Sequence, residues 1–251
     1  MKFREYIETN QVFTVEDIYS VTSTATARTL LHRALKSGDI ERARRGVYIS
    51  KVGKYRGEVP DPFHVVTVAD PAAVISWHSA LVAHGVAHNV SFVCSFRSST
   101  VRSPFEYGGV RYVPFVTSDQ PLTQVVRAKA YGKATVTTRE QTITDCLTHP
   151  GRAGGIEEAV RSCSAFPYVD VDALLGILEG LPVAVVARVG WLLETKKDSW
   201  GVEDGVLDVL ESRLGRGPSR LDPHAKKSHG WNARWKLYLP EEESEVASWI
   251  S

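Results

Sequence analysis

The stretch FTVEDIYSVTSTATARTLLHRALKSGDIERARRGVYI, residues 13–49, decides the fold of this 251-residue chain. Its middle part repeats apolar residues at helical spacing, so that they fall on one stripe of a helix. The members of this stripe are Ala27, Leu30, Leu31, Ala34 and Leu35. Thr22 or Ser23 can cap the start of the helix, and Gly38 follows its end, where a left-handed residue is usually needed. The spacing therefore predicts an amphipathic helix with defined ends.

The flanks of this helix complete a known arrangement. Before it, Val15, Ile18 and Val21 predict a short first helix, followed by a turn of small polar residues. After it, residues 40–49 have the pattern of strand, basic tip and strand. A short helix, a turn, a second helix and a hairpin together predict a winged helix-turn-helix, which we expect to occupy residues 1–57.

Charge is distributed unevenly along the chain. Residues 1–57 contain 11 lysines and arginines against 6 aspartates and glutamates, a net charge of +5. Residues 58–251 contain 19 against 23, a net charge of −4, so the total of +1 hides the asymmetry. The basic residues Arg42, Arg44, Arg45 and Lys51 can lie along a phosphate backbone while the helix enters a major groove. A basic module of this kind gains affinity for nucleic acid by counterion release, and its binding weakens as salt rises.

The rest of the chain predicts a larger mixed domain at residues 58–251. Residues 50–61, rich in glycine and charge, indicate a linker. We expect a helix at residues 75–84, then strands joined at Gly108-Gly109 and a strand at 133–137. Thr138 and Gln141 have the spacing of a capping box. The expected helices and the final strand that follow are residues 138–147, 156–166, 171–181, 183–196 and 202–214, and then 231–239. The fold class is therefore α+β, a winged helix-turn-helix followed by a larger α+β domain.

Composition excludes several classes of protein. No apolar run approaches the roughly 20 residues that a membrane-spanning helix needs. The N-terminus does not resemble a signal peptide, because charged residues interrupt it before any apolar run, so we expect a cytoplasmic protein that does not bind membranes. Cys94, Cys146 and Cys163 are widely spaced and lie in apolar contexts, which predicts reduced core thiols rather than a disulfide or zinc framework.

Five segments give the chain a resemblance to the AbiEi family of antitoxins, which belong to type IV toxin-antitoxin systems. They are RRGVY at residues 44–48, SALVAHGV at 79–86, TREQTITDCL at 138–147, ARVGWLLE at 187–194 and RWKLYLP at 234–240. None is a catalytic signature, and their order and spacing over nearly the whole chain carry the resemblance. It implies a transcriptional repressor that binds inverted operator repeats upstream of its own operon and counters a nucleotidyltransferase toxin encoded next to it.

The resemblance also implies which residues contact operator DNA. On the helix and the hairpin these are Thr24, Thr26, Arg28, His32, Arg33, Arg42, Arg44 and Arg45. Arg28 is the residue we expect to read bases, because arginine can bind guanine O6 and N7 with two hydrogen bonds. The hairpin arginines are expected to set affinity instead.

The sequence leaves two alternative functions open. Glu194-Thr195-Lys196 matches half of a restriction-like metal site, with Asp170 and Asp172 upstream, which would make the protein a nuclease or an RNA-modifying enzyme targeted by the winged helix. Helical spacing around Glu194 favours a solvated helix end over that site. In the second alternative, the α+β part binds a metabolite and the protein is a ligand-responsive regulator.

Other clusters predict no site of their own. His78, His84 and His88 lack an acidic or cysteine residue that would complete a metal site. The basic run from Arg213 to Lys227 is typical of a solvated face. We therefore expect no metal, no cofactor and no catalytic residue. Exposed aromatic residues would be the first place to seek antitoxin contacts, and the candidates are Trp200, Trp231, Trp235 and Trp249.

Overall fold

The computed structural model describes residues 2–117, 120–128 and 132–250, and its contacts divide the chain into two compact units. Unit 1 comprises residues 1–75, 92–119 and 125–135, and unit 2 comprises residues 76–91, 120–124 and 136–251. The predicted domain boundary at residue 57 lies inside unit 1. The predicted domains differ from the two units because β-strands from residues 92–135 pack with the N-terminal region. A change in composition along the chain does not reveal such an association between distant segments.

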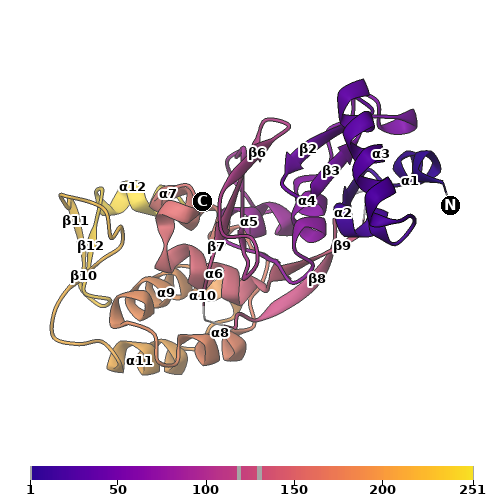
Figure 1. Ribbon diagram of the computed structural model, residues 1–251. Coiled ribbons are helices and arrows are strands. Elements are labelled where there is room, and N and C mark those ends of the chain that lie inside the picture. Colours follow the sequence, from indigo (N-terminus) through magenta and orange to yellow (C-terminus); the bar gives the residue numbers. More distant parts are fainter. Residues whose placement is uncertain (1, 118–119, 129–131, 251) are drawn as a thin grey trace. The chain divides into compact units, whose positions relative to one another are not determined.

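Unit 1 begins with a winged helix-turn-helix, as the pattern of residues 13–49 predicted (Figure 1). Its elements in chain order are α1 Phe3–Thr9, β1 Val12–Thr14, α2 Val15–Tyr19, α3 Thr24–Ser37, β2 Ile40–Arg44 and β3 Val47–Ser50. The strands form an antiparallel sheet in the order β1-β3-β2. The predicted helix and hairpin are confirmed, whereas α1 and β1 were not predicted because each is too short to show a period.

Local capping fixes the ends of the two central helices. Thr14 and Asp17 cap α2 reciprocally: the Asp17 amide donates to the Thr14 hydroxyl at 3.1 Å, and the Thr14 amide donates to the Asp17 carboxylate at 2.7 Å. Ser23 caps α3 by accepting from the Thr26 amide, and Gly38 ends it with a φ of 75°, as predicted. The apolar stripe of α3 then packs on Phe13 and other buried residues of the first 52 residues.

The remainder of unit 1 adds helix α4 (Pro62–Ala69) and most of a six-stranded sheet, in the order β6-β7-β5-β4-β9-β8. The strands are β4 Val74–Ile75, β5 Val93–Arg97, β6 Phe105–Tyr107, β7 Val110–Phe115, β8 Thr123–Ala128 and β9 Gly132–Thr137. Gly108 and Gly109 join β6 to β7 with φ values of 59° and 78°, as the predicted two-residue turn requires. The predicted linker contains the 3₁₀ turn Gly53–Tyr55, and the Tyr55 hydroxyl donates to the Thr9 carbonyl at 2.8 Å.

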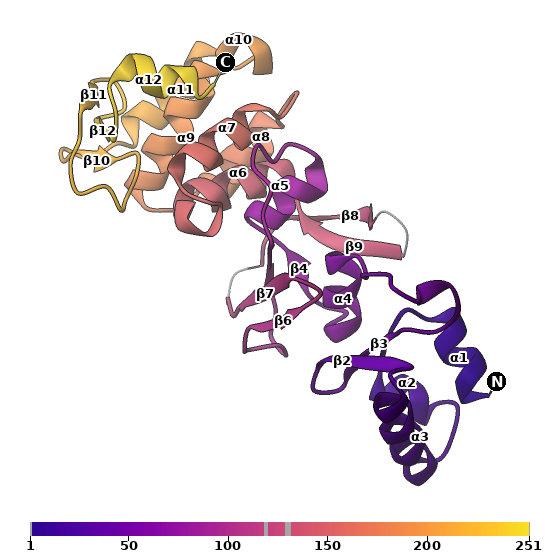
Figure 2. The same ribbon diagram turned by 90° about the horizontal axis from the view of Figure 1, so that it is seen from above.

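Unit 2 is mainly helical and surrounds one continuous apolar core. Its helices are α5 His78–His84, α6 Arg139–Thr148, α7 Ile156–Ser164, α8 Val171–Leu178, α9 Val183–Thr195, α10 Lys197–Trp200, α11 Asp204–Ser212 and α12 Glu243–Ser248. Thr138 caps α6 by accepting from the Gln141 amide, as predicted. Figure 2 shows the small sheet of β10 (Ser219–Arg220), β11 (Gly230–Asn232) and β12 (Leu237–Leu239) next to α9 and α12. In the described residues, no helix combines the length and the apolar character needed to cross a bilayer.

The prediction of one strand over residues 231–239 is wrong. Two short antiparallel strands, β11 and β12, occupy this segment, and between them the chain turns through Lys236 at a φ of 50°. The cause is Trp235, which is fully buried within the turn and donates its indole N–H to the Glu194 carboxylate at 2.7 Å. Satisfying a buried indole N–H outweighed the alternation of apolar residues along the segment.

Buried polar groups of unit 2 are tied to its backbone. Arg188 of α9 is buried, and its guanidinium donates to the carbonyls of Leu147 at 2.9 Å and Arg220 at 2.8 Å. Burial lowers the pKa of Arg188, although the charge of Asp222 acts in the opposite direction. The side chain therefore links the end of α6 to β10. The three cysteines are free and buried, as predicted, and burial raises the pKa of the Cys146 thiol.

Candidate nucleic-acid interface

Helix α3 presents a polar face to solvent. Thr24, Arg28 and His32 follow one another at four-residue intervals and are exposed, as are Thr26 and Arg33. Thr26 accepts a hydrogen bond from the Ser23 hydroxyl at 2.8 Å, so its side chain is oriented by the N-cap. Within the described residues, neither Arg28 nor Arg33 has an ion-pair partner. Both guanidinium groups are thus available to an external anion.

The hairpin of β2 and β3 separates its three arginines into two kinds. Arg42 and Arg45 are exposed, and the Arg42 guanidinium lies 5.8 Å from the centre of the Tyr48 ring. Arg44 is half-buried, with its guanidinium 5.3 Å from the centre of the Phe105 ring. Burial lowers the pKa of Arg44, partly offset by the charge of Asp70. The sequence could not distinguish these roles, because Phe105 lies 61 positions further along the chain.

The sequence did not predict a contact that holds the hairpin, between Tyr107 and Glu41. The Tyr107 hydroxyl on β6 donates to the Glu41 carboxylate on β2 at 2.6 Å, and Lys51 lies 3.7 Å from the same carboxylate. Burial, and then the hydrogen bond to Glu41, raises the pKa of Tyr107. Glu41 is the one acidic residue of the hairpin, so Lys51 partly neutralises the charge that would repel a phosphate backbone, and Tyr107 fixes the position of the carboxylate. No local sequence signal links residues so far apart.

The hairpin arginines provide a test of phosphate contact. Replacing Arg42 and Arg45 together by alanine is expected to weaken DNA binding similarly for all sequences and to reduce the salt slope by about two, because each phosphate contact releases about one counterion. Titrations at several salt concentrations measure this slope. The control is the pair Lys54→Ala and Arg56→Ala, which removes the same charge from exposed residues outside α3 and the hairpin. An unchanged slope in the hairpin variant would contradict phosphate contact there.

The acidic residue of the nuclease alternative is used structurally. Glu194 lies in α9, where its two carboxylate oxygens accept from Arg234 at 2.8 Å and from Trp235 at 2.7 Å. Arg234 also pairs with Asp208 and Glu211, each at 2.8 Å. This arrangement confirms the predicted helix in place of the strand that a restriction-like site uses. Glu194 is one of three carboxylates that hold Arg234, and it stabilises the turn of Trp235.

The structural role of Glu194 leads to an expected result for Glu194→Ala. We expect the free energy of unfolding to fall by about 2–3 kcal/mol, because two hydrogen bonds to a charged acceptor are lost and a buried indole N–H stays unpaired. Denaturant titration measures this loss. Incubation of wild type and variant with operator DNA and Mg²⁺ is expected to give equal, background cleavage. Cleavage by the wild type that Glu194→Ala removes would instead support the nuclease.

The rings of His78 and His84 are held by other groups of unit 2. His78 lies 3.3 Å from the buried Glu158 carboxylate, and the His84 ring bonds the Thr137 carbonyl at 2.9 Å. Burial lowers the pKa of His84 more than the hydrogen bond to Thr137 raises it. No group of three potential metal ligands occurs among the residues that the structure describes.

Most of the candidate tryptophans are buried, and two arginines of the basic run from Arg213 to Lys227 bind backbone carbonyls. Trp200, Trp235 and Trp249 are buried, whereas Trp231 is 45% exposed and packs on Tyr238 with ring centres 5.0 Å apart. In the basic run, the Arg213 guanidinium donates to the Leu178 carbonyl and the Arg220 guanidinium to the Ala225 carbonyl. Those two arginines therefore stabilise the fold of unit 2, and only Trp231 of the four tryptophans is open to a partner.

Comparison with known proteins supports the assignment of the N-terminal region. Residues 4–51 match the sequence profile of a family described as "Transcriptional regulator, AbiEi antitoxin". The crystal structure of the RV2827C protein from Mycobacterium tuberculosis has a similar fold, with a TM-score of 0.67 and 17% identity over 97% of this chain and 90% of that chain. A search of curated proteins gives no match. The resemblance seen in the sequence is thus confirmed over the winged helix, where residues 4–51 match the AbiEi family of antitoxin transcriptional regulators.

Proposed function

We propose that this protein is a DNA-binding antitoxin that represses its own operon and counters a nucleotidyltransferase toxin encoded beside it. The observation that carries the proposal is a winged helix of the AbiEi family whose Arg28, Arg33, Arg42 and Arg45 are exposed. On a recognition helix and a hairpin, exposed cations that have no ion-pair partner among the described residues match the groups that DNA-binding proteins of this architecture use.

In the proposed complex, α3 enters the major groove of operator DNA. Thr24 and Arg28 lie toward its N-terminal end, the part of a recognition helix that usually contacts base edges. Arg42 and Arg45 contact the phosphate backbone from the hairpin. Arg44 contributes mainly by packing on Phe105 and holding the hairpin in place. Inverted repeats in the operator would seat one molecule on each half-site.

We assign toxin neutralisation to the part of the chain beyond the winged helix, residues 58–251. The net charge of this part is −4, and the exposed Trp231 and Tyr238 offer it an aromatic surface. A slightly acidic body has little electrostatic attraction for DNA and is free for another partner. Neutralisation by direct contact and neutralisation through a shared target are both compatible with this assignment.

A co-expression experiment tests the two activities separately. The neighbouring nucleotidyltransferase is induced in cells that also express, from an unrelated promoter, either the full chain or the full chain with Arg28→Ala and Arg33→Ala. A reporter behind the operator measures repression in the same cells. We expect both proteins to restore growth and only the wild type to repress.

Each part of the proposal has its own contrary outcome. Failure of the wild type to restore growth, with the protein present at normal levels, would overturn the antitoxin assignment. A wild type that neither represses the reporter nor shifts operator DNA at low salt would overturn the repressor assignment. Loss of growth rescue in a folded, non-repressing variant would show that neutralisation requires the winged helix.

A further inference from the structure

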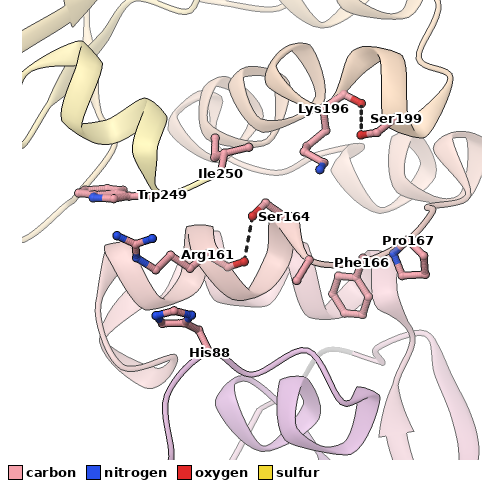
Figure 3. A pocket seen from close by; sticks show the side chains of 10 residues that line it. His88, Arg161, Ser164, Phe166, Pro167, Lys196, Ser199, Trp249 and Ile250 are labelled. Atoms are coloured by element: carbon pink, nitrogen blue, oxygen red, sulfur yellow. Dashed lines mark hydrogen bonds between the residues drawn. The ribbon is translucent and has the colours of Figure 1, made fainter.

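Unit 2 contains a cavity of about 460 Å³ that the proposed function does not use. It lies where the C-terminal ends of α7 and α9 meet the last residues of the described chain (Figure 3). Its polar lining comes from Arg161, Lys196, His88, Ser164 and Ser199, and its apolar lining includes Trp249. No carboxylate lines it among the described residues. The volume is within the range of small-molecule sites, roughly 300–1,000 Å³.

The two permanent cations of the cavity differ in how firmly they are held. Arg161 is fixed, because its Nε pairs with Glu157 at 2.9 Å and its Nη1 donates to the Ser248 carbonyl at 3.3 Å. Lys196 has no ion-pair partner within the described chain, and its ammonium lies 5.9 Å from the centre of the Trp200 ring. Figure 3 shows the Lys196 side chain extending from its helix end toward α7. One cation is thus preorganised and the other is free to close on an anion.

The remaining polar groups of the cavity can bind parts of a ligand other than its anionic group. The Ser164 hydroxyl donates to the Arg161 carbonyl at 2.9 Å, and the Ser199 hydroxyl donates to the Lys196 carbonyl at 3.0 Å. Both hydroxyl hydrogens are therefore used, and the oxygens are left as acceptors. The His88 backbone amide donates to the Ser162 hydroxyl at 2.9 Å, which fixes the position of this residue at the cavity wall. The cavity offers cations to an anionic group and acceptors to the hydroxyl or amino groups of the same ligand.

We propose that this cavity binds a mononucleotide, with its phosphate between Lys196 and Arg161. A phosphate monoester carries the charge that two cations favour in a cavity whose described lining contains no carboxylate. The sugar hydroxyls and base amino groups donate to Ser164 and Ser199. The base packs against the apolar and aromatic part of the lining, to which Trp249 and Phe166 contribute. This proposal does not rest on the DNA-binding or antitoxin function.

Calorimetric titration of the full chain with four compounds tests the proposal. AMP is expected to bind, adenosine to bind at least tenfold more weakly because it lacks the phosphate, and ribose 5-phosphate and inorganic phosphate to bind more weakly than AMP because they lack the base. Lys196→Gln is expected to weaken AMP binding roughly 10- to 100-fold, the cost of one charge-assisted hydrogen bond. Lys196→Arg, which keeps the charge, should stay within a few-fold of the wild type.

Lys227→Gln is the matched control, because it removes one exposed positive charge from unit 2 outside the cavity. It should bind AMP like the wild type, and circular dichroism should show that all variants are folded. Absence of AMP binding at millimolar concentration would overturn the proposal. So would equal affinity of Lys196→Gln and wild type, or equal affinity for adenosine and AMP. Equal affinity for inorganic phosphate and AMP would overturn the assignment of a nucleotide.

Discussion

Replacing Gly190 by alanine is expected to lower the free energy of unfolding by about 3 kcal/mol or more, or to prevent unit 2 from folding. A Cβ at this position of α9 would lie 2.1, 2.4 and 2.6 Å from three ring carbons of Trp235. Trp235 cannot move away easily, since it is fully buried and its indole N–H is bonded to Glu194. Denaturant or thermal unfolding measures the loss.

Two companion variants make this expectation specific. Gly176→Ala places the same substitution in α8, where an added Cβ meets nothing within 4 Å, and it should stabilise the protein by roughly 0.5–1 kcal/mol. Combining Gly190→Ala with Trp235→Leu should recover part of the lost stability, because the smaller side chain leaves room for the methyl group. If Gly190→Ala unfolds like Gly176→Ala, the close packing of Trp235 on α9 is wrong.

The double variant Arg28→Ala and Arg33→Ala is expected to weaken binding to operator DNA about 100-fold or more. A bidentate contact of Arg28 with guanine is worth roughly 1–3 kcal/mol, and loss of the Arg33 charge weakens binding further. Each guanidinium is exposed without an ion-pair partner in the described part of the chain. Stability should stay close to that of the wild type because neither side chain belongs to the apolar core. Gel shifts with operator and unrelated DNA, at one fixed salt concentration, measure the effect.

Arg28→Lys separates base reading from charge. Lysine keeps the positive charge but cannot form the planar pair of hydrogen bonds, so specificity for the operator should fall while the salt slope stays unchanged. If this variant and the wild type discriminate equally between operator and unrelated DNA, Arg28 contacts phosphate rather than a base. If the double variant still binds the operator like the wild type, α3 is not the recognition helix.

The winged helix could be predicted because its signals are local. The apolar stripe of α3, its N-cap Ser23 and its final Gly38 lie within 16 consecutive residues, and each acts through neighbours in the chain. The predicted contacts on this helix are exposed, as the period of the helix requires. The two roles of the hairpin arginines could not be predicted, because the packing of Arg44 depends on Phe105 of a distant strand.

The C-terminal segment shows the opposite case. Alternating apolar residues predicted a strand through Trp235. Alternation indicates which residues share one face of a sheet, but it does not reveal a hydrogen-bond partner such as Glu194, 41 positions away. Helices α6 to α9 were predicted well, since their periods and breaks at Pro150, Pro167 and Pro182 are also local.

The sequence alone determined the winged helix and the helical character of the second unit, because capping and periodicity act over a few neighbouring positions. It also determined the basic charge of the winged helix, which is counted directly from the residues. Only the tertiary structure decided that Trp235 packs on Gly190, that Glu41 meets Tyr107, and that Arg161 and Lys196 line one cavity. These groups come together through burial of apolar surface, which is non-directional. No periodic pattern in the sequence therefore indicates which distant residues will meet.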